Sequence, residues 1–298
     1  MTSATSSSSR ALTIAGFDPS GGAGVLVDVR TFAAFGFEAV AAITSLTFQN
    51  TVGVFGAVHQ TGETVRAQVM PLLADQQIVC AKVGVLPTRE VVLEVARLFR
   101  ETELPRPVID PVIMSSSGHR LMDEPALEAL IRELLPLANV ITPNIPEAET
   151  LTGTTIASEA DMRRAAAVIR ELGARAVLIK GGHLKRQKAV GSRQKAVSSE
   201  HWAAGSGQSG GSPTLREGSN TEAQGESDEA IDVLDNEGTV TVFREKRVSG
   251  AELHGSGCIL SAAIAAGLGK GMTLEDSVGA AKRFVLEAIR SRVAAKCL

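Results

Sequence analysis

Residues 254–258 read His-Gly-Ser-Gly-Cys and continue directly into small and apolar residues, ILSAAIAAG. This pattern predicts a glycine-rich turn followed by a helix, with Cys258 at the junction. A helix N-terminus presents unpaired backbone N–H groups and the positive end of the helix dipole, so it favours an anion. A thiol in that place is expected to have a lowered pKa. The segment therefore predicts either a phosphate cradle beside an acid–base group or a small residue packed under a turn.

Two segments near the N-terminus place glycines and polar side chains where predicted strands end. GFDPSGGAG (16–24) reads as a strand end, a glycine-rich turn and a helix start, but it lacks the spacing of a dinucleotide fingerprint. TSLTFQNT (44–51) puts Thr47 and Gln49 after an apolar strand, where open α/β sheets bind ligands. An amide both donates and accepts hydrogen bonds, which suits a heterocycle with a ring nitrogen and an amino group. A tight turn and a surface loop explain the same residues without a ligand.

Asn144 and Glu147 stand three residues apart in TPNIPEAE (142–149), at the start of a predicted helix. This spacing puts both side chains on one face, where an amide and a carboxylate can hold Mg²⁺ directly or through water. The same spacing is typical of an N-cap asparagine with a capping-box glutamate. Taken alone, the two residues favour the helix cap.

Two charged residues come at the ends of predicted buried strands. Lys180 ends the apolar run of VLIKGGH (177–183), where an ammonium group is costly to bury without an anion such as phosphate. Asp110 ends a strand in VIDPV and is a candidate for a metal or for water at a phosphate site. A lysine that extends to solvent and an aspartate that begins a turn before proline are the alternatives without a ligand.

These side chains have to be positioned by alternating strands and helices. Strands are predicted at 11–15, 38–46, 53–59, 78–84, 107–113, 138–143 and 176–182, and helices at 22–35, 61–73, 88–100, 124–135, 145–151 and 159–172. A hairpin is predicted at 230–243 around Asn236-Glu237-Gly238, and two helices at 257–267 and 274–291. The alternation and the continuous apolar strands predict an α/β fold with a largely parallel sheet covered on both faces. We expect one domain over 10–298, with a disordered tail at 1–9 and a disordered insertion at 184–229.

Composition excludes several classes of function. The 298 residues carry a net charge of −3, and aromatic residues make up 3%, which argues against nucleic acid and membrane partners. The three cysteines are far apart and form no zinc-ligand spacing, and their odd number argues against a disulfide framework. The N-terminus has no apolar signal segment, and no run is long enough to span a membrane. We expect a cytoplasmic protein.

GFDPSGGAG, QNT, TPNIPEAE, KGGH and HGSGC occur in an order and spacing that resemble the bacterial hydroxymethylpyrimidine/phosphomethylpyrimidine kinases of thiamine biosynthesis, in the ribokinase-like superfamily. The resemblance covers about residues 11–183 and 230–290. It implies a three-layer α/β/α sandwich with a mainly parallel central sheet, and an enzyme that uses ATP and Mg²⁺. Such enzymes phosphorylate 4-amino-5-hydroxymethyl-2-methylpyrimidine and then convert the monophosphate to the diphosphate. The resemblance also implies a homodimer.

The resemblance implies roles for individual residues. The pyrimidine pocket would be lined by Gly16, Asp28, Thr47, Gln49, Val85 and Val112. The groups around ATP, Mg²⁺ and the transferred phosphoryl group would be Asp110, Asn144, Glu147, Lys180, Gly255, Ser256, Gly257 and Cys258. Among these, Glu147 would be the metal ligand, Lys180 would contact the ATP phosphates and residues 255–257 would form the anion hole. Cys258 would accept the proton of the substrate hydroxyl, where sugar kinases of the superfamily carry an aspartate.

Some residues depart from the family pattern and leave alternatives open. Phe17 stands where the family often has Thr or Ser, and Val85 where it often has Met. Pyridoxal kinases of the same superfamily share the glycine turn and the cysteine, whereas Gln49 favours an aminopyrimidine. A binding protein without turnover is a further alternative, against which the complete Asn144, Glu147, Lys180 and Cys258 set argues. The cysteine in place of aspartate argues against a sugar kinase.

Overall fold

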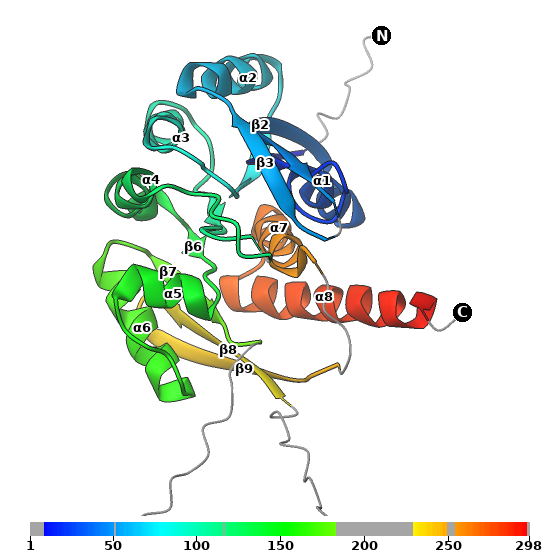
Figure 1. The fold of residues 1–298 in the computed structure, drawn as a ribbon, viewed down its shortest axis with the longest axis vertical. Coiled ribbons are helices and arrows are strands. Elements are labelled where there is room, and N and C mark those ends of the chain that lie inside the picture. The colour runs from blue at the N-terminus through cyan, green and yellow to red at the C-terminus, as the bar shows by residue number, and fades with distance from the viewer. Residues whose placement is uncertain (1–8, 51, 116, 183–228, 249–253, 297–298) are drawn as a thin grey trace, which may run out of the picture.

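The computed structural model describes residues 9–50, 52–115, 117–182, 229–248 and 254–296. In this part of the chain the strands form a single nine-stranded sheet in the order β3-β2-β1-β4-β5-β6-β7-β8-β9 (Figure 1). The strands are β1 (Arg10–Phe17), β2 (Glu38–Gln49), β3 (Val54–His59), β4 (Ile78–Val83), β5 (Val108–Ile109), β6 (Val140–Ile141), β7 (Ala176–Lys180), β8 (Glu229–Asn236) and β9 (Thr239–Lys246). The helices are α1 (Gly24–Ala34), α2 (Gly62–Asp75), α3 (Arg89–Glu101), α4 (Glu124–Ala129), α5 (Ile145–Thr152), α6 (Glu159–Glu171), α7 (Ser256–Gly269) and α8 (Leu274–Lys296).

The centre of the sheet is parallel and both of its edges are antiparallel. Strands β2, β1, β4, β5, β6 and β7 pair in parallel. Strand β3 pairs antiparallel with β2 at one edge, and β8 and β9 continue the sheet antiparallel at the other. The C-terminal ends of the parallel strands therefore lie together at one end of the sheet. The loops that follow these strands meet there.

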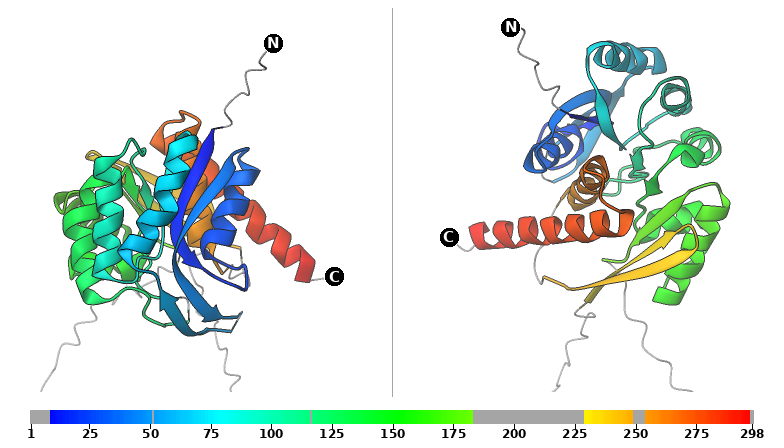
Figure 2. Two further views of the ribbon diagram at one scale, coloured as in Figure 1. Left: turned by 90° about the horizontal axis from the view of Figure 1, so that it is seen from above. Right: turned by 180° about the vertical axis from the view of Figure 1, so that it is seen from behind.

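Helices cover the two faces of the sheet as separate layers (Figure 2). One apolar core joins the sheet to helices α2 to α6 and includes Val65, Val95 and Ile169. The other joins it to α1, α7 and α8 and includes Phe32 and Ile264. Strand residues alternate between the two cores, which is why the strands are apolar along their whole length. The three-layer α/β/α architecture expected from the sequence is confirmed.

The predicted elements are all present within the described residues, and three of them are shorter or irregular. The strand predicted at 107–113 contains only Val108–Ile109, because Asp110 and Pro111 turn the chain away. The strand predicted at 138–143 contains only Val140–Ile141. The helix predicted at 124–135 changes after α4 into a π-helical turn and then a 3₁₀ turn, which begins next to Pro136. Proline lacks the N–H that a continuing α-helix needs.

The hairpin predicted near 236 is confirmed. Glu237 and Gly238 form its two-residue loop, and both have positive φ, 52° and 94°, as a type I′ turn requires. The predicted tail at 1–9 and insertion at 184–229 lie outside the described residues, except for Ser9 and Glu229. Among the helices that the structure describes, none combines the length and the apolar character needed to cross a membrane.

Candidate active site

The residues expected to do chemistry meet at the end of the sheet where the parallel strands have their C-termini. They stand near the ends of β1, β2 and β7, in the loops after β4, β5 and β6, and at or near the starts of α1, α5 and α7. Lys180 pairs with Asn144 through an isolated bridge, which brings the end of β7 beside the start of α5. Open parallel sheets bind ligands at this end, because backbone N–H groups and side chains are free there.

Lys180 and Asp110 form the centre of the site. The Lys180 Nζ lies 2.9 Å from Asp110 Oδ1, and the Thr142 hydroxyl donates to the same oxygen at 3.3 Å. Burial opposes the charge on Lys180, but Asp110 and Glu147 outweigh it and raise the pKa of the ammonium. Burial likewise opposes the charge on Asp110, and Lys180 and Lys82 lower the pKa of this carboxyl. The buried lysine predicted to need an anion therefore has a carboxylate as its partner in the protein.

Asn144 and Glu147 form the capping box that their spacing predicts. The Asn144 side chain accepts from the Glu147 N–H at 2.9 Å, and the Glu147 carboxylate accepts from the Asn144 N–H at 2.8 Å. Glu147 also interacts electrostatically with Lys180 and Asp110, so it can act in the site as well as cap the helix. Burial raises the pKa of Glu147 to about 7, with Asp110 acting in the same direction and Lys180 against it. A buried carboxyl that titrates near neutrality beside a second carboxylate suits a cation site.

The first turn of α7 packs closely against the glycine turn at 16–24. Gly255 is the N-cap with φ of 82°, and a Cβ there would lie 2.0 Å from the Gly22 carbonyl oxygen. A Cβ at Gly257 would lie 3.1 Å from Lys180 Nζ and 3.6 Å from Asp110 Oδ2. No side chain caps this helix start, so its N–H groups are available beside the ammonium. The HGSGC segment and Lys180, far apart in sequence, are neighbours in the fold.

Cys258 lies in this first turn and is half-buried. Burial raises the pKa of its thiol to about 11, and the carboxylates of Asp110 and Asp28 act in the same direction. Lys82 and a hydrogen bond from the Gly24 N–H lower it, but not enough to compensate. The sequence-based expectation of a lowered pKa is therefore wrong for this thiol. The positive end of the helix dipole favours the thiolate, but burial and the two carboxylates oppose it more strongly.

Asp18, which the sequence interpretation did not select, anchors the glycine turn. One carboxylate oxygen accepts from the N–H and hydroxyl of Ser20, at 2.8 and 2.7 Å, and the other accepts from the Ala23 N–H at 2.9 Å. His254 Nε2 lies 3.4 Å from Asp18 Oδ2. Burial raises the pKa of Asp18, but these hydrogen bonds and one from the Gln49 side chain lower it below its usual value. The Asp-Pro-Ser order was the available sequence signal, because aspartate before such a turn bonds the backbone two residues on.

The residues expected to line the pyrimidine pocket differ in how accessible they are. Gln49, Val85 and Val112 are partly exposed, and a Cβ at Gly16 would lie 3.5 Å from the Val85 side chain. The Thr47 hydroxyl donates to the Phe17 carbonyl at 2.9 Å. These four side chains and the Gly16 backbone lie at one end of the sheet.

Asp28 lies deeper than a pocket-lining residue. Its side chain has no exposed surface, and its carboxylate bonds Lys82 and Thr13. It therefore has no exposed surface for direct contact with a ligand, unlike the pocket-lining residue that the resemblance implies. Lys82 was not selected from the sequence, although a lysine within the apolar strand IVCAKVG was a visible signal.

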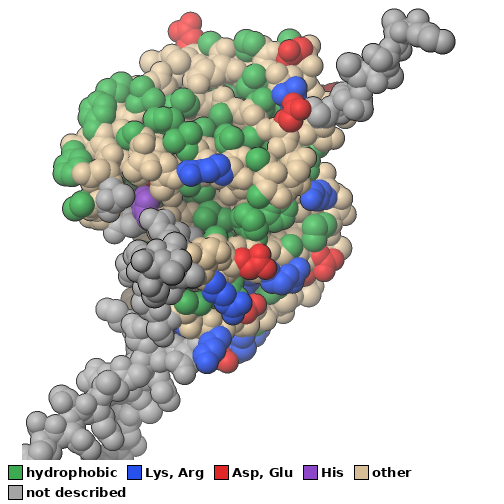
Figure 3. All heavy atoms as spheres, turned by 90° about the vertical axis from the view of Figure 1, so that its right-hand side faces the viewer, with side chains coloured by type: hydrophobic (Ala, Val, Ile, Leu, Met, Phe, Trp, Pro, Cys, Tyr) green, Lys and Arg blue, Asp and Glu red, His purple; other side chains and the backbone are tan. Residues whose placement is uncertain are grey.

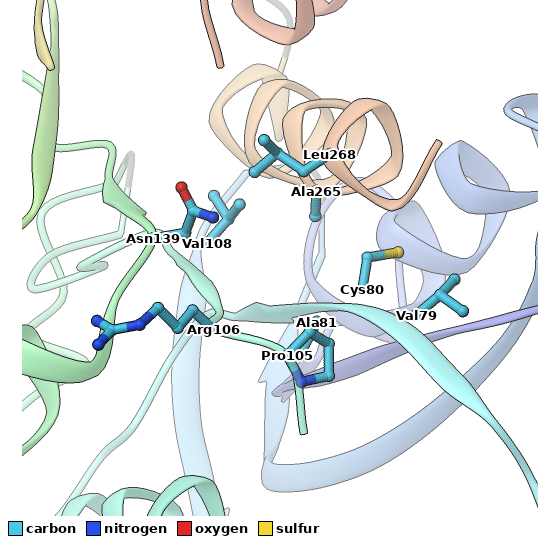
Figure 4. A pocket seen from close by; sticks show the side chains of 9 residues that line it. All are labelled: Val79, Cys80, Ala81, Pro105, Arg106, Val108, Asn139, Ala265 and Leu268. Carbon is cyan, nitrogen blue, oxygen red and sulfur yellow. The ribbon is translucent and has the colours of Figure 1, made fainter. Parts of the chain in front are cut away.

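A small pocket lies at the opposite end of the sheet, where the parallel strands begin (Figure 4). It is lined by the beginning of β4 at 79–81, by Arg106 and Asn139 before β5 and β6, and by Leu268 near the end of α7. None of the predicted site residues lines it. Among the described residues, no three His, Cys, Asp or Glu side chains gather as a metal cluster.

This geometry is that of the ribokinase-like kinases, and comparison with known proteins makes the relationship more specific. A model of the phosphomethylpyrimidine kinase family matches residues 18–206 and 214–296. A hydroxymethylpyrimidine/phosphomethylpyrimidine kinase of Rhizobium meliloti is 38% identical over 280 residues, which cover 94% of this chain and 90% of the relative.

Two solved structures are similar over nearly the whole chain. Phosphomethylpyrimidine kinase from Clostridium difficile matches with a TM-score of 0.71 and 33% identity, covering 94% of this chain and 99% of that one. An ADP complex of Bacillus subtilis pyridoxal kinase matches with a TM-score of 0.72 and 31% identity, covering 93% and 90%. The chain belongs to the phosphomethylpyrimidine kinase family and is an ATP-dependent kinase.

Proposed function

We propose that this chain transfers the γ-phosphoryl group of ATP to 4-amino-5-hydroxymethyl-2-methylpyrimidine and then to its monophosphate, in thiamine diphosphate biosynthesis. The observation that supports this most strongly is the convergence of five groups at the end of the sheet where the parallel strands end. These are the Lys180 ammonium, the Asp110 and Glu147 carboxylates, the uncapped start of α7 and the Cys258 thiol. Phosphoryl transfer needs such a set of cationic, anion-binding and proton-accepting groups.

The chain's own residues act on the two substrates as follows. Lys180 binds the ATP phosphates, and the N–H groups of residues 255–257 stabilise charge on the transferring phosphoryl group. The substrate hydroxyl oxygen bonds to the γ-phosphorus while the bond to the ADP oxygen breaks, and the hydroxyl proton passes to the Cys258 sulfur. A thiol with a pKa of about 11 is ionised in only about one molecule in 10⁴ at pH 7. Proton acceptance by Cys258 therefore becomes easier as the pH rises.

Asp110 and Glu147 are the residues that would hold Mg²⁺. Mg²⁺ is commonly bound by one or two carboxylates together with substrate phosphates and water, so a site with two carboxylates fits it. Burial raises the pKa of Glu147 to about 7, and the nearby Asp110 carboxylate acts in the same direction; a divalent cation would favour the ionised form of Glu147. When bound, the ion supplies neutralisation of phosphate charge.

Gln49 supports the pyrimidine as the acceptor. Its side chain is a hydrogen-bond partner of Asp18, which is held ionised by its other bonds and so can only accept. The Gln49 amide N–H₂ thus faces Asp18, and its carbonyl oxygen is left to accept from a ligand donor such as the 4-amino group. Pyridoxal is the second candidate, because the similarity to a pyridoxal kinase structure is as close as that to a phosphomethylpyrimidine kinase structure.

The test is ATP turnover with Mg²⁺ and three separate acceptors, with product masses measured. The acceptors are the hydroxymethylpyrimidine, its monophosphate and pyridoxal. We expect the pyrimidine to give monophosphate and then diphosphate, and Lys180→Ala to lose turnover. Preferential phosphorylation of pyridoxal would overturn the substrate assignment, and pyrimidine binding without ATP consumption would favour a binding protein. Glu128→Gln, an exposed change on α4, is the matched control.

A homodimer is part of this proposal. Strands β2 and β3, at the edge of the sheet, and the loop between them expose several large apolar side chains: Leu46, Phe48, Val52, Phe55 and Val58, the last three of them 82%, 71% and 50% exposed. Figure 3 shows hydrophobic side chains gathered at the upper left of one face of the molecule. Monomeric proteins rarely expose such a patch. We expect Phe55→Glu to reduce the mass in light scattering to that of one chain, whereas Val168→Glu on α6 leaves it unchanged.

We also place the enzyme in the cytoplasm, acting on small molecules without nucleic acid or a membrane. The support is compositional: a net charge of −3 gives no general attraction to polyanions, and the sparse cysteines suit a reducing compartment. Fractionation of cells that produce the chain, with an activity assay of each fraction, tests the location. Activity in the membrane fraction would contradict it.

A further inference from the structure

Lys82 is a buried charge that the proposed mechanism does not use. Its neighbours on β4 divide between the two cores: Ala81 and Val83 pack against the layer of α2 to α6, whereas Cys80 packs against that of α7 and α8. Because strand side chains alternate, Lys82 points to the same side as Cys80, toward α1 and α7. Its side chain has no exposed surface.

Asp28 on α1 and Thr13 on β1 fix the position of this ammonium. Lys82 Nζ donates to both Asp28 oxygens, at 3.0 and 2.8 Å, and the Thr13 hydroxyl donates to Asp28 at 2.6 Å. The absent side chain of Gly84 leaves the space that the ammonium needs, since a Cβ there would lie 2.8 Å from Nζ. Burial opposes the charge, but Asp28 raises the pKa of Lys82, so the ammonium stays protonated.

The ion pair lies close enough to the start of α7 for both of its charges to act on Cys258. Helix α7 packs against α1, β4 and β5, and Cys258 is in its first turn. Cys258 accepts a hydrogen bond from the N–H of Gly24, and Asp28 stands four residues further along α1, on the same face of that helix. Lys82 and Cys258 thus approach the same turn of α1 from β4 and α7.

The charged groups that face Cys258 come from every element packed around it. They are Asp28 from α1, Lys82 from β4, Asp110 after β5 and Lys180 from β7. The two carboxylates disfavour a thiolate. Lys180 is bonded to Asp110 and is the group that we assign to the ATP phosphates, whereas the Lys82 charge is enclosed by the protein and bonded to Asp28.

A fully buried ion pair is costly, and an apolar pair of similar volume often packs as stably. Its presence at this depth therefore calls for a function other than stability. We propose that Lys82 is a positioning residue: its buried ammonium, held by Asp28 and Thr13, provides the fixed positive charge that stabilises the Cys258 thiolate. This inference rests on the proposed role of Cys258 as the proton acceptor.

The test measures the reactivity of the thiol rather than turnover. Lys82→Met combined with Asp28→Asn removes both charges with side chains of similar size, which avoids an unpaired buried charge. The rate of iodoacetamide addition at Cys258 is followed across pH by mass spectrometry of the peptide that contains it. Because the Lys82 charge acts on the thiol more strongly than the opposing Asp28 charge, we expect the thiol pKa to rise and alkylation at pH 8 to fall several-fold, up to about tenfold for a rise of one unit. Lys82→Gln removes the charge and shortens the side chain while keeping Asp28; it is the second variant and should shift the pKa in the same direction.

The matched control is the other buried ion pair of the described residues in the same helical layer. Lys282 of α8 pairs with Asp232 of β8, and neither is among the groups that face Cys258. Lys282→Met combined with Asp232→Asn should leave the alkylation profile unchanged. Circular dichroism and thermal melting establish that each variant is folded.

A folded Lys82 variant with the native alkylation profile would overturn the proposal, as would an equal shift in the control. Turnover of Cys258→Ala separates this inference from the function on which it rests. If that variant turns over normally while the Lys82 variants shift the thiol pKa, Lys82 stabilises the thiolate but Cys258 is not the base. Tenfold lower kcat in the Lys82 variants, restored as the pH is raised by one unit, would support both.

Discussion

Glu147 offers a prediction in which stability and activity move in opposite directions. Its carboxyl is 5% exposed, lies near Asp110 and has a pKa raised from 4.5 to about 7. Replacing it by glutamine keeps the size of the side chain and an oxygen that can complete the capping box with Asn144. Glu147→Gln removes only the ionisation, so it isolates the cost of placing a second carboxylate in this site.

The sign and size of the effect follow from the two pKa values. Between pH 4.5 and 7 the folded chain binds more protons at Glu147 than the unfolded chain does, so the free energy of unfolding falls as the pH rises. A difference of about 2.5 pKa units corresponds to about 3 kcal/mol, lost progressively over that range. Glu147→Gln should therefore be more stable than the natural chain at pH 8, by up to about 3 kcal/mol, and equally stable at pH 4.

Urea unfolding of both chains at several pH values measures this difference. Mg²⁺ provides a second comparison, because a ligand that binds only the folded chain stabilises it by mass action. Mg²⁺ should stabilise the natural chain at pH 8 and should have much less effect on Glu147→Gln, which should also lose turnover. A variant less stable than the natural chain at pH 8 would refute the reasoning. Glu128→Gln, an exposed change on α4, should alter neither quantity.

Three further changes test other parts of the site. Cys258→Ala should lower kcat about 10²- to 10⁴-fold with pyrimidine binding retained in calorimetry, and near-normal kcat would exclude an essential base. Gly255→Ala should abolish turnover in the same kcat assay, because a Cβ at this residue, whose φ is 82°, would lie 2.0 Å from the Gly22 carbonyl oxygen and displace the start of α7. Gly271→Ala is the control, because Gly271 has a similar φ of 77° but open space around it. Gln49→Leu should raise KM for the pyrimidine at least tenfold in initial-rate assays, and an unchanged KM would remove Gln49 from recognition.

The local elements could be predicted from the sequence because their causes are local. Apolar strands alternate with helices, and Glu237-Gly238 has the residue types that a tight hairpin turn accepts, so the sheet and its last hairpin could be placed without a structure. The capping box of Asn144 and Glu147 is equally local. The short β5 is the instructive exception, since an apolar run continues on both sides of Asp110 and Pro111 while the ladder stops before them.

The electrostatic character of the site depends on distant pairs that no spacing in the sequence encodes. Asp28 and Lys82 are 54 residues apart, and Asp110 and Lys180 are 70 residues apart, yet each pair shares a hydrogen bond. Only the order of the strands decides which charges become neighbours. The sequence alone thus determined the family motifs, the elements and the end of the sheet where ligands bind. The tertiary structure decided that Cys258 is a poorly ionised thiol and that Glu147 titrates near neutrality, because burial and the nearest charges set those pKa values.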